Sequence, residues 1–224
     1  MLIPRIITAV ALLAVLLPAV FAVSPEPFAA VTLLLIVAAC WEWGRLNQMG
    51  SLPALGVGIA VGVGLAGGWW GQALADAIAP SWERALWLLV STSWVLGSAA
   101  LVRSGVSAWM PLARSFRLVL GWLLLAATWW AMARARTLGI NFLLSLMVLV
   151  WAADVAAYFG GRAWGKRKLA AAISPGKTWA GAWSGAGAVL VLGIAWQRLD
   201  QTGLVDGASI FTILADRHLL IALI

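Results

Sequence analysis

The feature that most constrains this chain is a series of apolar runs, each close to the length that crosses a membrane. A transmembrane helix needs about 20 mainly apolar residues to span a hydrocarbon core about 30 Å thick. The 224 residues are 63% hydrophobic and 10% charged, and no polar stretch is long enough for a separate soluble domain. We therefore predict an all-α, polytopic integral membrane protein in which residues 1–224 form a single transmembrane domain. About seven spans are expected, near residues 6–23, 28–41, 52–70, 85–102, 118–132, 138–159 and 180–196.

The two ends of the chain allow further expectations. Residues 219–224 are an apolar run that is too short to span, and we interpret it as the start of an eighth span. At the other end, Arg5 precedes an apolar core and a small-residue site follows at Ala22-Val23-Ser24, so a signal peptide is an alternative to a first transmembrane helix. The further spans that follow at once favour the helix.

Basic residues indicate the orientation of the spans, because short cytoplasmic loops are enriched in Lys and Arg. Alternate loops of a seven-span chain carry ten basic residues on the side of the N-terminus and five on the other. The N-terminus is therefore predicted to be cytoplasmic. The net charge of +7 fits this bias and does not require a nucleic-acid partner. The ten are Arg5, Arg45, Arg103, Arg114, Arg117, Arg162, Lys166, Arg167, Lys168 and Lys177.

Composition also limits the chemistry. Cys40 and His218 are the single cysteine and histidine of the chain, which excludes a disulfide framework, a Cys/His zinc site and a Cys–His catalytic pair. Any reaction must therefore use carboxylates, lysines and arginines.

Asp154 is a functional candidate because it lies inside an otherwise apolar predicted helix. An ionised carboxylate is costly there unless it faces protein, water or a cation. A metal or catalytic role is one interpretation. A carboxylate that hydrogen-bonds a neighbouring helix for packing is the other.

The segment after Tyr158 is predicted to bind phosphate. We expect a loop in which Gly160, Gly161 and Gly165 free the backbone, with four positive charges at Arg162, Lys166, Arg167 and Lys168. An ordinary cytoplasmic loop attracted to anionic headgroups is the alternative interpretation.

Ser174-Pro175-Gly176-Lys177-Thr178 favours the phosphate interpretation, because it is typical of a helix start with Ser174 as the N-cap and Pro175 in the first turn. A helix N-terminus offers N–H groups and a positive dipole end to an anion. Together with Asp154, residues 150–185 thus predict a pocket for a metal and a triphosphate. Neither glycine cluster matches the P-loop pattern G-x-x-x-x-G-K-[ST], since Arg167 and Ala171 stand at required positions.

The residues from Asp154 to Gly181 resemble the central part of the bacterial phosphatidate cytidylyltransferases, also called CDP-diacylglycerol synthases. The likeness rests on Asp154, Ala157-Tyr158-Phe159-Gly160-Gly161-Arg162, Gly165-Lys166, Lys168-Leu169 and Ser174 to Trp179, with weaker support from Arg5-Ile6-Ile7-Thr8-Ala9 and Glu42-Trp43-Gly44-Arg45-Leu46. Two features depart from the family. Ala180 stands where a glutamate is usual, and the aspartate-rich C-terminal segment of the family is missing.

The resemblance implies transfer of a cytidylyl group from CTP to phosphatidic acid, giving CDP-diacylglycerol and pyrophosphate, with Mg²⁺ or another divalent cation. It implies a multi-pass protein of the cell inner membrane whose partners are CTP, phosphatidic acid and the bilayer, with a homodimer as a candidate assembly. It also implies that this chain lacks activity without the C-terminal segment. The implied catalytic residues are Asp154, Lys166 and Lys177, with Asp154 also on the metal, and the implied substrate-binding residues are Tyr158, Arg162, Lys168, Ser174 and Thr178.

Other functions remain open at this point. A transporter or channel would place Asp154 on an ion path, but it predicts internal repeats, and none is found. A non-catalytic membrane protein would use the basic segment to bind anionic lipids. A CDP-alcohol phosphotransferase would need an aspartate-rich helix, whereas Asp154 is the single acid between Glu83 and Asp200.

Overall fold

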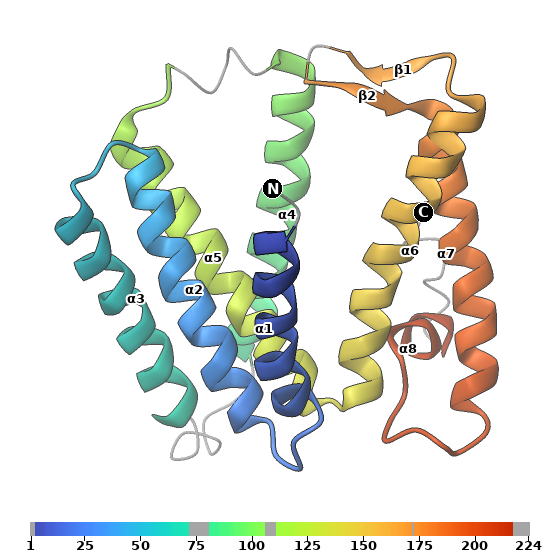
Figure 1. Cartoon of the computed structure of the whole chain (residues 1–224), viewed down its shortest axis with the longest axis horizontal. Helices are drawn as coiled ribbons and strands as arrows, with labels where there is room; N and C mark the ends of the chain where they lie inside the picture. Colours follow the sequence, from blue (N-terminus) through green and yellow to red (C-terminus); the bar gives the residue numbers. More distant parts are fainter. Residues whose placement is uncertain (1–2, 72–80, 106–110, 172, 217–224) are drawn as a thin grey trace. The chain divides into compact units, whose positions relative to one another are not determined.

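The computed structural model describes residues 3–71, 81–105, 111–171 and 173–216. The chain divides into two compact units, Met1–Arg134 and Ala135–Ile224, and each is described here by itself (Figure 1). The described residues form eight helices and one two-stranded hairpin. The helices are α1 (Ile3–Val20), α2 (Glu26–Leu46), α3 (Ser51–Gly71), α4 (Ser81–Ser104), α5 (Arg114–Thr137), α6 (Ile140–Trp164), α7 (Trp179–Asp200) and α8 (Ile210–Asp216).

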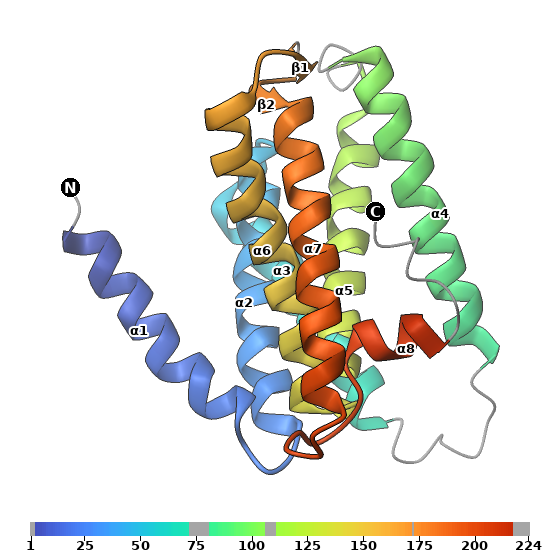
Figure 2. The ribbon, with the colours of Figure 1, turned by 90° about the vertical axis from the view of Figure 1, so that its right-hand side faces the viewer.

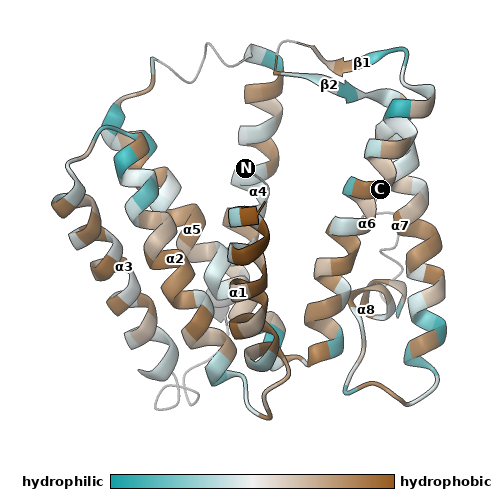
Figure 3. Cartoon of the chain, in the orientation of Figure 1, coloured by the Kyte–Doolittle hydropathy of each residue, from teal (hydrophilic) through white to brown (hydrophobic). Residues whose placement is uncertain are grey.

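Six of these helices, α2 to α7, are long and apolar enough to cross a membrane, which confirms the polytopic helical prediction. Their bodies are mostly hydrophobic in Figure 3, whereas the strands and several helix ends carry hydrophilic residues. The first predicted span corresponds to α1, whose apolar part, Ile6–Val20, is shorter than the other six. The predicted start of an eighth span, residues 219–224, lies outside the described residues.

In the first unit, α3 packs along α2 through two glycines that face Val37 of α2. A Cβ built on Gly58 would lie 2.9 Å from the carbonyl oxygen of Val37, and one on Gly62 would lie 2.5 Å from Val37 Cγ2. Both glycines are buried. Small residues at this spacing let membrane helices approach closely, so the contact is set by backbone proximity rather than by large side chains.

Tryptophans connect α2 with α5. Each of three indole N–H groups donates to a backbone carbonyl oxygen on the facing helix, so a large apolar ring fills the space between helices while its polar atom is satisfied. The pairs are Trp43 with Arg117, Trp122 with Cys40, and Trp129 with Ala29, at 3.2, 3.2 and 3.1 Å.

In the second unit, α6 and α7 pack along their lengths and are joined by a hairpin of β1 (Lys168–Ala170) and β2 (Ser174–Thr178). Figures 1 and 2 both show the hairpin at one end of this helix pair and α8 near the other. The strands are antiparallel, with Lys168 opposite Thr178 and Ala170 opposite Ser174. The hairpin was not predicted, and the two strands place the basic segment against the end of the helix pair.

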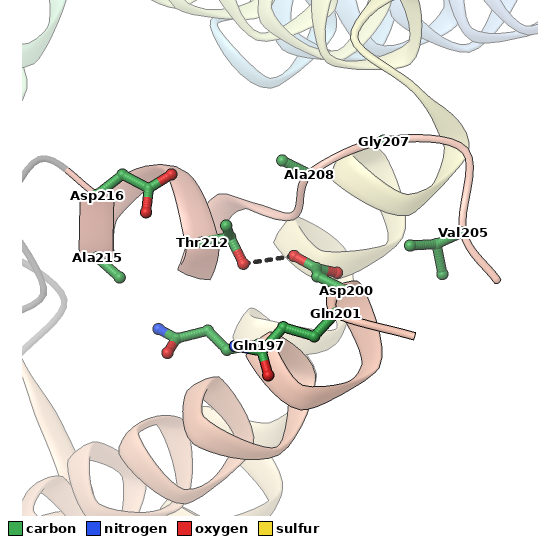
Figure 4. Close-up of a pocket in the computed structure, with 9 residues that line it drawn as sticks. All are labelled: Gln197, Asp200, Gln201, Val205, Gly207, Ala208, Thr212, Ala215 and Asp216. Atoms are coloured by element: carbon green, nitrogen blue, oxygen red, sulfur yellow. Dashed lines mark hydrogen bonds between the residues drawn. The ribbon is translucent and has the colours of Figure 1, made fainter. Parts of the chain in front are cut away.

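A polar cluster fastens the α8 end of this unit. The carboxylate of Asp200 accepts hydrogen bonds from the backbone N–H and hydroxyl of Ser209, from the Thr212 hydroxyl and from the Asn141 amide, at 2.8, 2.6, 2.5 and 2.8 Å. Figure 4 shows the bond from Thr212. Asp206 accepts from the backbone N–H groups of Ile140 and Asn141, at 2.6 and 2.8 Å, and so caps the start of α6. These bonds hold the chain between α7 and α8 against the beginning of α6.

Candidate functional site

A pocket of about 520 Å³ lies at the hairpin end of α6 and α7, where the sequence predicted the phosphate site. It takes residues from the last turns of α6, from both strands and from the first turn of α7. Five of the eight predicted site residues line it. The lining consists of Ala157, Tyr158, Gly161, Arg162, Leu169, Ser174, Gly176, Lys177, Thr178, Gly181 and Ala182.

The segment after Tyr158 is not the predicted loop, because α6 continues to Trp164. Gly160 and Gly161 are therefore helical, and Arg162 lies in the last turn. Tyr158 and Arg162 are one turn apart on the same face of α6, and an Arg162 Nη1 group donates to the Tyr158 hydroxyl at 3.2 Å. The helix, rather than a flexible loop, orients these two side chains.

The glycines near the end of α6 are needed for close packing. A Cβ on Gly160 would overlap the Ser184 side chain, and one on Gly161 would lie 3.0 Å from Thr178 Oγ1. On α7, a Cβ at Gly181 would lie 2.7 Å from the Ala157 carbonyl oxygen. These glycines, on both helices, allow α6 and α7 to meet directly below the pocket.

The predicted helix start at Ser174 is wrong. Ser174 to Thr178 form strand β2, and α7 begins at Trp179 with Thr178 as its N-cap. A proline disfavours helical backbone in the residue before it, which keeps Ser174 extended and available for pairing with β1. The buried Thr178 Oγ1 accepts from the Gly181 N–H at 3.1 Å, so this hydroxyl has a structural role at the edge of the pocket.

Two cations, Arg162 and Lys177, line the pocket, and its described lining contains no carboxylate. The first turn of α7 is less open to an anion than predicted. The Trp179 N–H donates to the Arg167 carbonyl oxygen at 3.0 Å, and the Gly181 N–H donates to Thr178. Side-chain charge therefore makes the pocket attractive to an anion more than backbone N–H groups do.

The remaining predicted cations lie outside the lining. Lys166 is exposed between α6 and β1, and Lys168 is exposed on β1. The Arg167 guanidinium lies over the Trp179 ring, with Cζ 5.7 Å from the ring centroid. Of the predicted cations, Arg162 and Lys177 thus line the cavity. Lys166, Arg167 and Lys168 lie outside its lining.

Asp154, the predicted metal ligand, is exposed on α6 one turn before Tyr158 and does not line the pocket. Within the described ranges, no group of three or more His, Cys, Asp or Glu side chains could hold a metal ion. Mg²⁺ commonly uses one or two carboxylates together with substrate phosphates and water. The donor set of these residues therefore fits only a metal ion held largely by the substrate itself.

Sequence reasoning missed the apolar wall of the pocket. Ala157, Leu169 and Ala182 have no polar atoms in their side chains, and they leave space beside Arg162 and Lys177. The signal in the sequence was the spacing of Ala157 and Gly161. They are four residues apart, which places two small residues on one face of a helix and leaves space beside it. Leu169 reaches the pocket through strand pairing, which the helical prediction did not contain.

Comparisons with known proteins place the sequence in a family. The model of the cytidylyltransferase family matches residues 3–222. A phosphatidate cytidylyltransferase of Pseudomonas aeruginosa is 33% identical over 186 residues, which cover 81% of this chain and 65% of the relative. Those of Haemophilus influenzae and Bacillus subtilis are 47% identical over 72 residues and 40% over 63 residues, covering 32% and 28% of this chain and 25% and 23% of the relatives. No solved structure matches the chain.

Proposed function

Because this chain belongs to the cytidylyltransferase family, we propose that it takes part in the transfer of a cytidylyl group from CTP to phosphatidic acid, which yields CDP-diacylglycerol and pyrophosphate. The chain spans 65% of the length of its Pseudomonas relative, and that relative is named a phosphatidate cytidylyltransferase. The reaction would take place where the lipid headgroup, still anchored in the bilayer, meets the soluble nucleotide.

The observation that carries the proposal is the cationic pocket between α6, the hairpin and α7. Arg162 and Lys177 converge there with the hydroxyls of Tyr158, Ser174 and Thr178, and no acid among the described lining residues opposes an anion. A guanidinium and an ammonium are the usual side-chain partners of phosphate oxygens. The apolar wall beside them suits the glycerol end of a lipid or the face of a pyrimidine.

The chemistry requires little proton transfer. A phosphate oxygen of phosphatidic acid is already anionic and attacks the α-phosphorus of CTP. As this P–O bond forms, the bond from the α-phosphorus to the oxygen bridging to the β-phosphorus breaks, and the electron pair leaves with pyrophosphate. Positioning and charge neutralisation therefore supply most of the catalysis, as in other phosphoryl-group transfers.

We assign the residues accordingly. Arg162 and Lys177 bind phosphate oxygens and offset their repulsion, while Tyr158 holds the Arg162 guanidinium in place through its hydroxyl. Ser174 supplies a further hydroxyl at the pocket edge. Lys166 and Lys168 attract the anionic substrates without contacting them in the cavity.

A divalent cation such as Mg²⁺ would supply Lewis-acid neutralisation of the polyphosphate when bound. Asp154 is the carboxylate of α6 that would contribute to holding it. Because Asp154 lies one turn from Tyr158 along the helix, substrate phosphates would have to provide most of the other ligands.

The proposed orientation puts the hairpin on the cytoplasmic side, since CTP is a cytoplasmic nucleotide and basic loops favour that side. With α1 counted as a span, as the sequence predicts, the N-terminus is also cytoplasmic, and we assign the protein to the cell inner membrane.

The test is a CTP-plus-phosphatidate assay on membranes that carry this chain, in parallel with the chain extended by the part of the Pseudomonas relative that the match leaves uncovered. We expect CDP-diacylglycerol in the extended form at least, with Lys177→Gln lowering kcat/KM by about tenfold or more, as loss of a charge-assisted hydrogen bond does. Lys168→Gln is the matched control and should cost about threefold or less. Product in neither form, or equal losses for the two lysines, would contradict the proposal.

A further inference from the structure

We infer that the first unit binds one acyl chain of an anionic glycerophospholipid in a groove between α2, α4 and α5, with the phosphate headgroup at Arg114 and Arg117. The groove has a volume of about 430 Å³. This site is separate from the pocket in the second unit, and it does not depend on cytidylyl transfer. Its lining residues are Ala39, Glu42, Trp43, Leu46, Trp94, Gly121, Leu124, Leu125 and Thr128.

The groove exists because glycine and tryptophan meet across α2 and α5. The Trp43 indole donates to the Arg117 carbonyl oxygen at 3.2 Å, and it occupies the position where a Cβ of Gly121 would stand. The Trp43 ring thus forms one wall of the groove. The Thr128 hydroxyl donates to the Leu124 carbonyl oxygen at 2.8 Å, so its hydrogen-bond donor is satisfied within α5.

Aromatic side chains pack next to the groove at the end away from the arginines. Trp129 follows Thr128 directly and is fully buried, with edge contacts to Trp69 and Trp130 at centroid distances of 5.8 and 6.0 Å. The lining residues of α5 run from Gly121 to Thr128, over which the helix rises by about 10 Å at ~1.5 Å per residue. That length is about a third of a hydrocarbon core ~30 Å thick, so the groove holds part of one acyl chain.

Charge identifies the occupant. Arg114 and Arg117 share a helical face with Gly121, Leu124 and Thr128, and they lie one to two turns before Gly121, outside the lining of the groove. A mainly apolar groove that continues towards two cations matches an acyl chain below an anionic phosphate. Glu42 is the acid of the lining, and with the two arginines it leaves this end of the groove net positive.

Photolabelling tests the inference without any nucleotide. The chain is reconstituted in nanodiscs that contain a trace of phosphatidylglycerol or phosphatidylcholine with the same diazirine-bearing acyl chain, and labelled residues are assigned by tandem mass spectrometry. Each arginine near an anionic lipid favours binding by about fivefold. We therefore expect the phosphatidylglycerol-to-phosphatidylcholine labelling ratio at Leu125 to exceed that at Leu123 by about fivefold or more. Leu123 is the internal control because it is 63% exposed and belongs to another face of α5.

Three substitutions, one of them a control, distinguish binding in the groove from general lipid contact. Leu124→Trp should fill the groove and remove most labelling of Leu125, whereas Leu123→Trp should leave it intact. Arg114→Gln, which changes no lining residue, should lower the ratio at Leu125 by about fivefold while elution in detergent stays unchanged. Equal ratios at Leu125 and Leu123 in the unmodified chain, or an unchanged ratio in Arg114→Gln, would overturn the inference.

Discussion

Replacing Asp200 with asparagine should destabilise the second unit by about 2 kcal/mol, because the carboxylate is the acceptor at the centre of the α8-end cluster. Its Oδ2 accepts from the backbone N–H and hydroxyl of Ser209 and from the hydroxyl of Thr212, and its Oδ1 accepts from the Asn141 amide. Asparagine keeps the shape of the side chain but has a single acceptor oxygen. The substitution therefore isolates hydrogen bonding and charge from packing.

The magnitude follows from counting donors. The Ser209 and Thr212 hydroxyls can rotate and accept from the new amide nitrogen, but the Ser209 backbone N–H cannot. If the new amide turns its oxygen to Ser209, its nitrogen faces the Asn141 amide nitrogen. That amide is held by Trp196, which donates to its oxygen at 2.9 Å, and by the Gly207 carbonyl oxygen at 2.7 Å. Either orientation leaves one N–H without an acceptor, at a cost of about 1–3 kcal/mol, and partial exposure of the cluster excludes values well above this range.

The measurement is equilibrium unfolding in mixed detergent micelles, followed by far-ultraviolet circular dichroism. Asp206→Asn is the matched control: it also removes one of two carboxylate acceptors from backbone N–H groups, but Asp206 is exposed, so water can accept in its place. Asp206→Asn should cost less than about 1 kcal/mol. The reasoning fails if Asp200→Asn lies within about 0.5 kcal/mol of the unmodified chain, or if the control costs as much.

Three further predictions concern the pocket. Thr178→Val should lower the free energy of unfolding by about 1 kcal/mol through loss of the N-cap, whereas Thr178→Ser should keep most of it. Chemical unfolding measures both, and equal losses would contradict the capping role. Gly160→Ala should cost about 1–3 kcal/mol because its Cβ would overlap Ser184, whereas Gly187→Ala, with open space around it, should be neutral or stabilising in the same experiment. Tyr158→Phe should raise the KM for CTP by about two- to fivefold and leave kcat unchanged, and a lower kcat with an unchanged KM would exclude a role in binding.

The helical spans could be predicted because hydropathy alone determines them, and α2 to α7 follow the predicted runs. The end of α6 could not, since glycine is usually read as a helix breaker. Gly160 and Gly161 lie in the helix where Ser184 and Thr178 leave little or no room for a side chain, and this contact is visible only in three dimensions. A residue that weakens a helix locally can thus be required by the packing of that helix.

The residues of the candidate site were predicted better than the secondary-structure elements that carry them. Arg162 and Lys177 were predicted from residue type and spacing and Tyr158 from the family resemblance, and all three line one cavity. Ser174 was assigned to the wrong element because Ser-Pro is also typical of helix starts. Pairing between β1 and β2, a contact between separate segments, decides the outcome in favour of a strand.

The two ends of the second unit use charge in opposite ways, and this difference bears on function. At the α8 end, every oxygen of Asp200 and Asp206 accepts a hydrogen bond from the chain itself, so these acids are satisfied within the fold. At the hairpin end, Arg162 and Lys177 share a cavity whose described lining offers no carboxylate. Two like charges in one pocket oppose folding unless an anion offsets them, and a ligand that binds only the folded state stabilises that state. A polyphosphate would remove this repulsion, which is why the hairpin end, rather than the more extensively hydrogen-bonded α8 end, is the better candidate for the site of nucleotide chemistry.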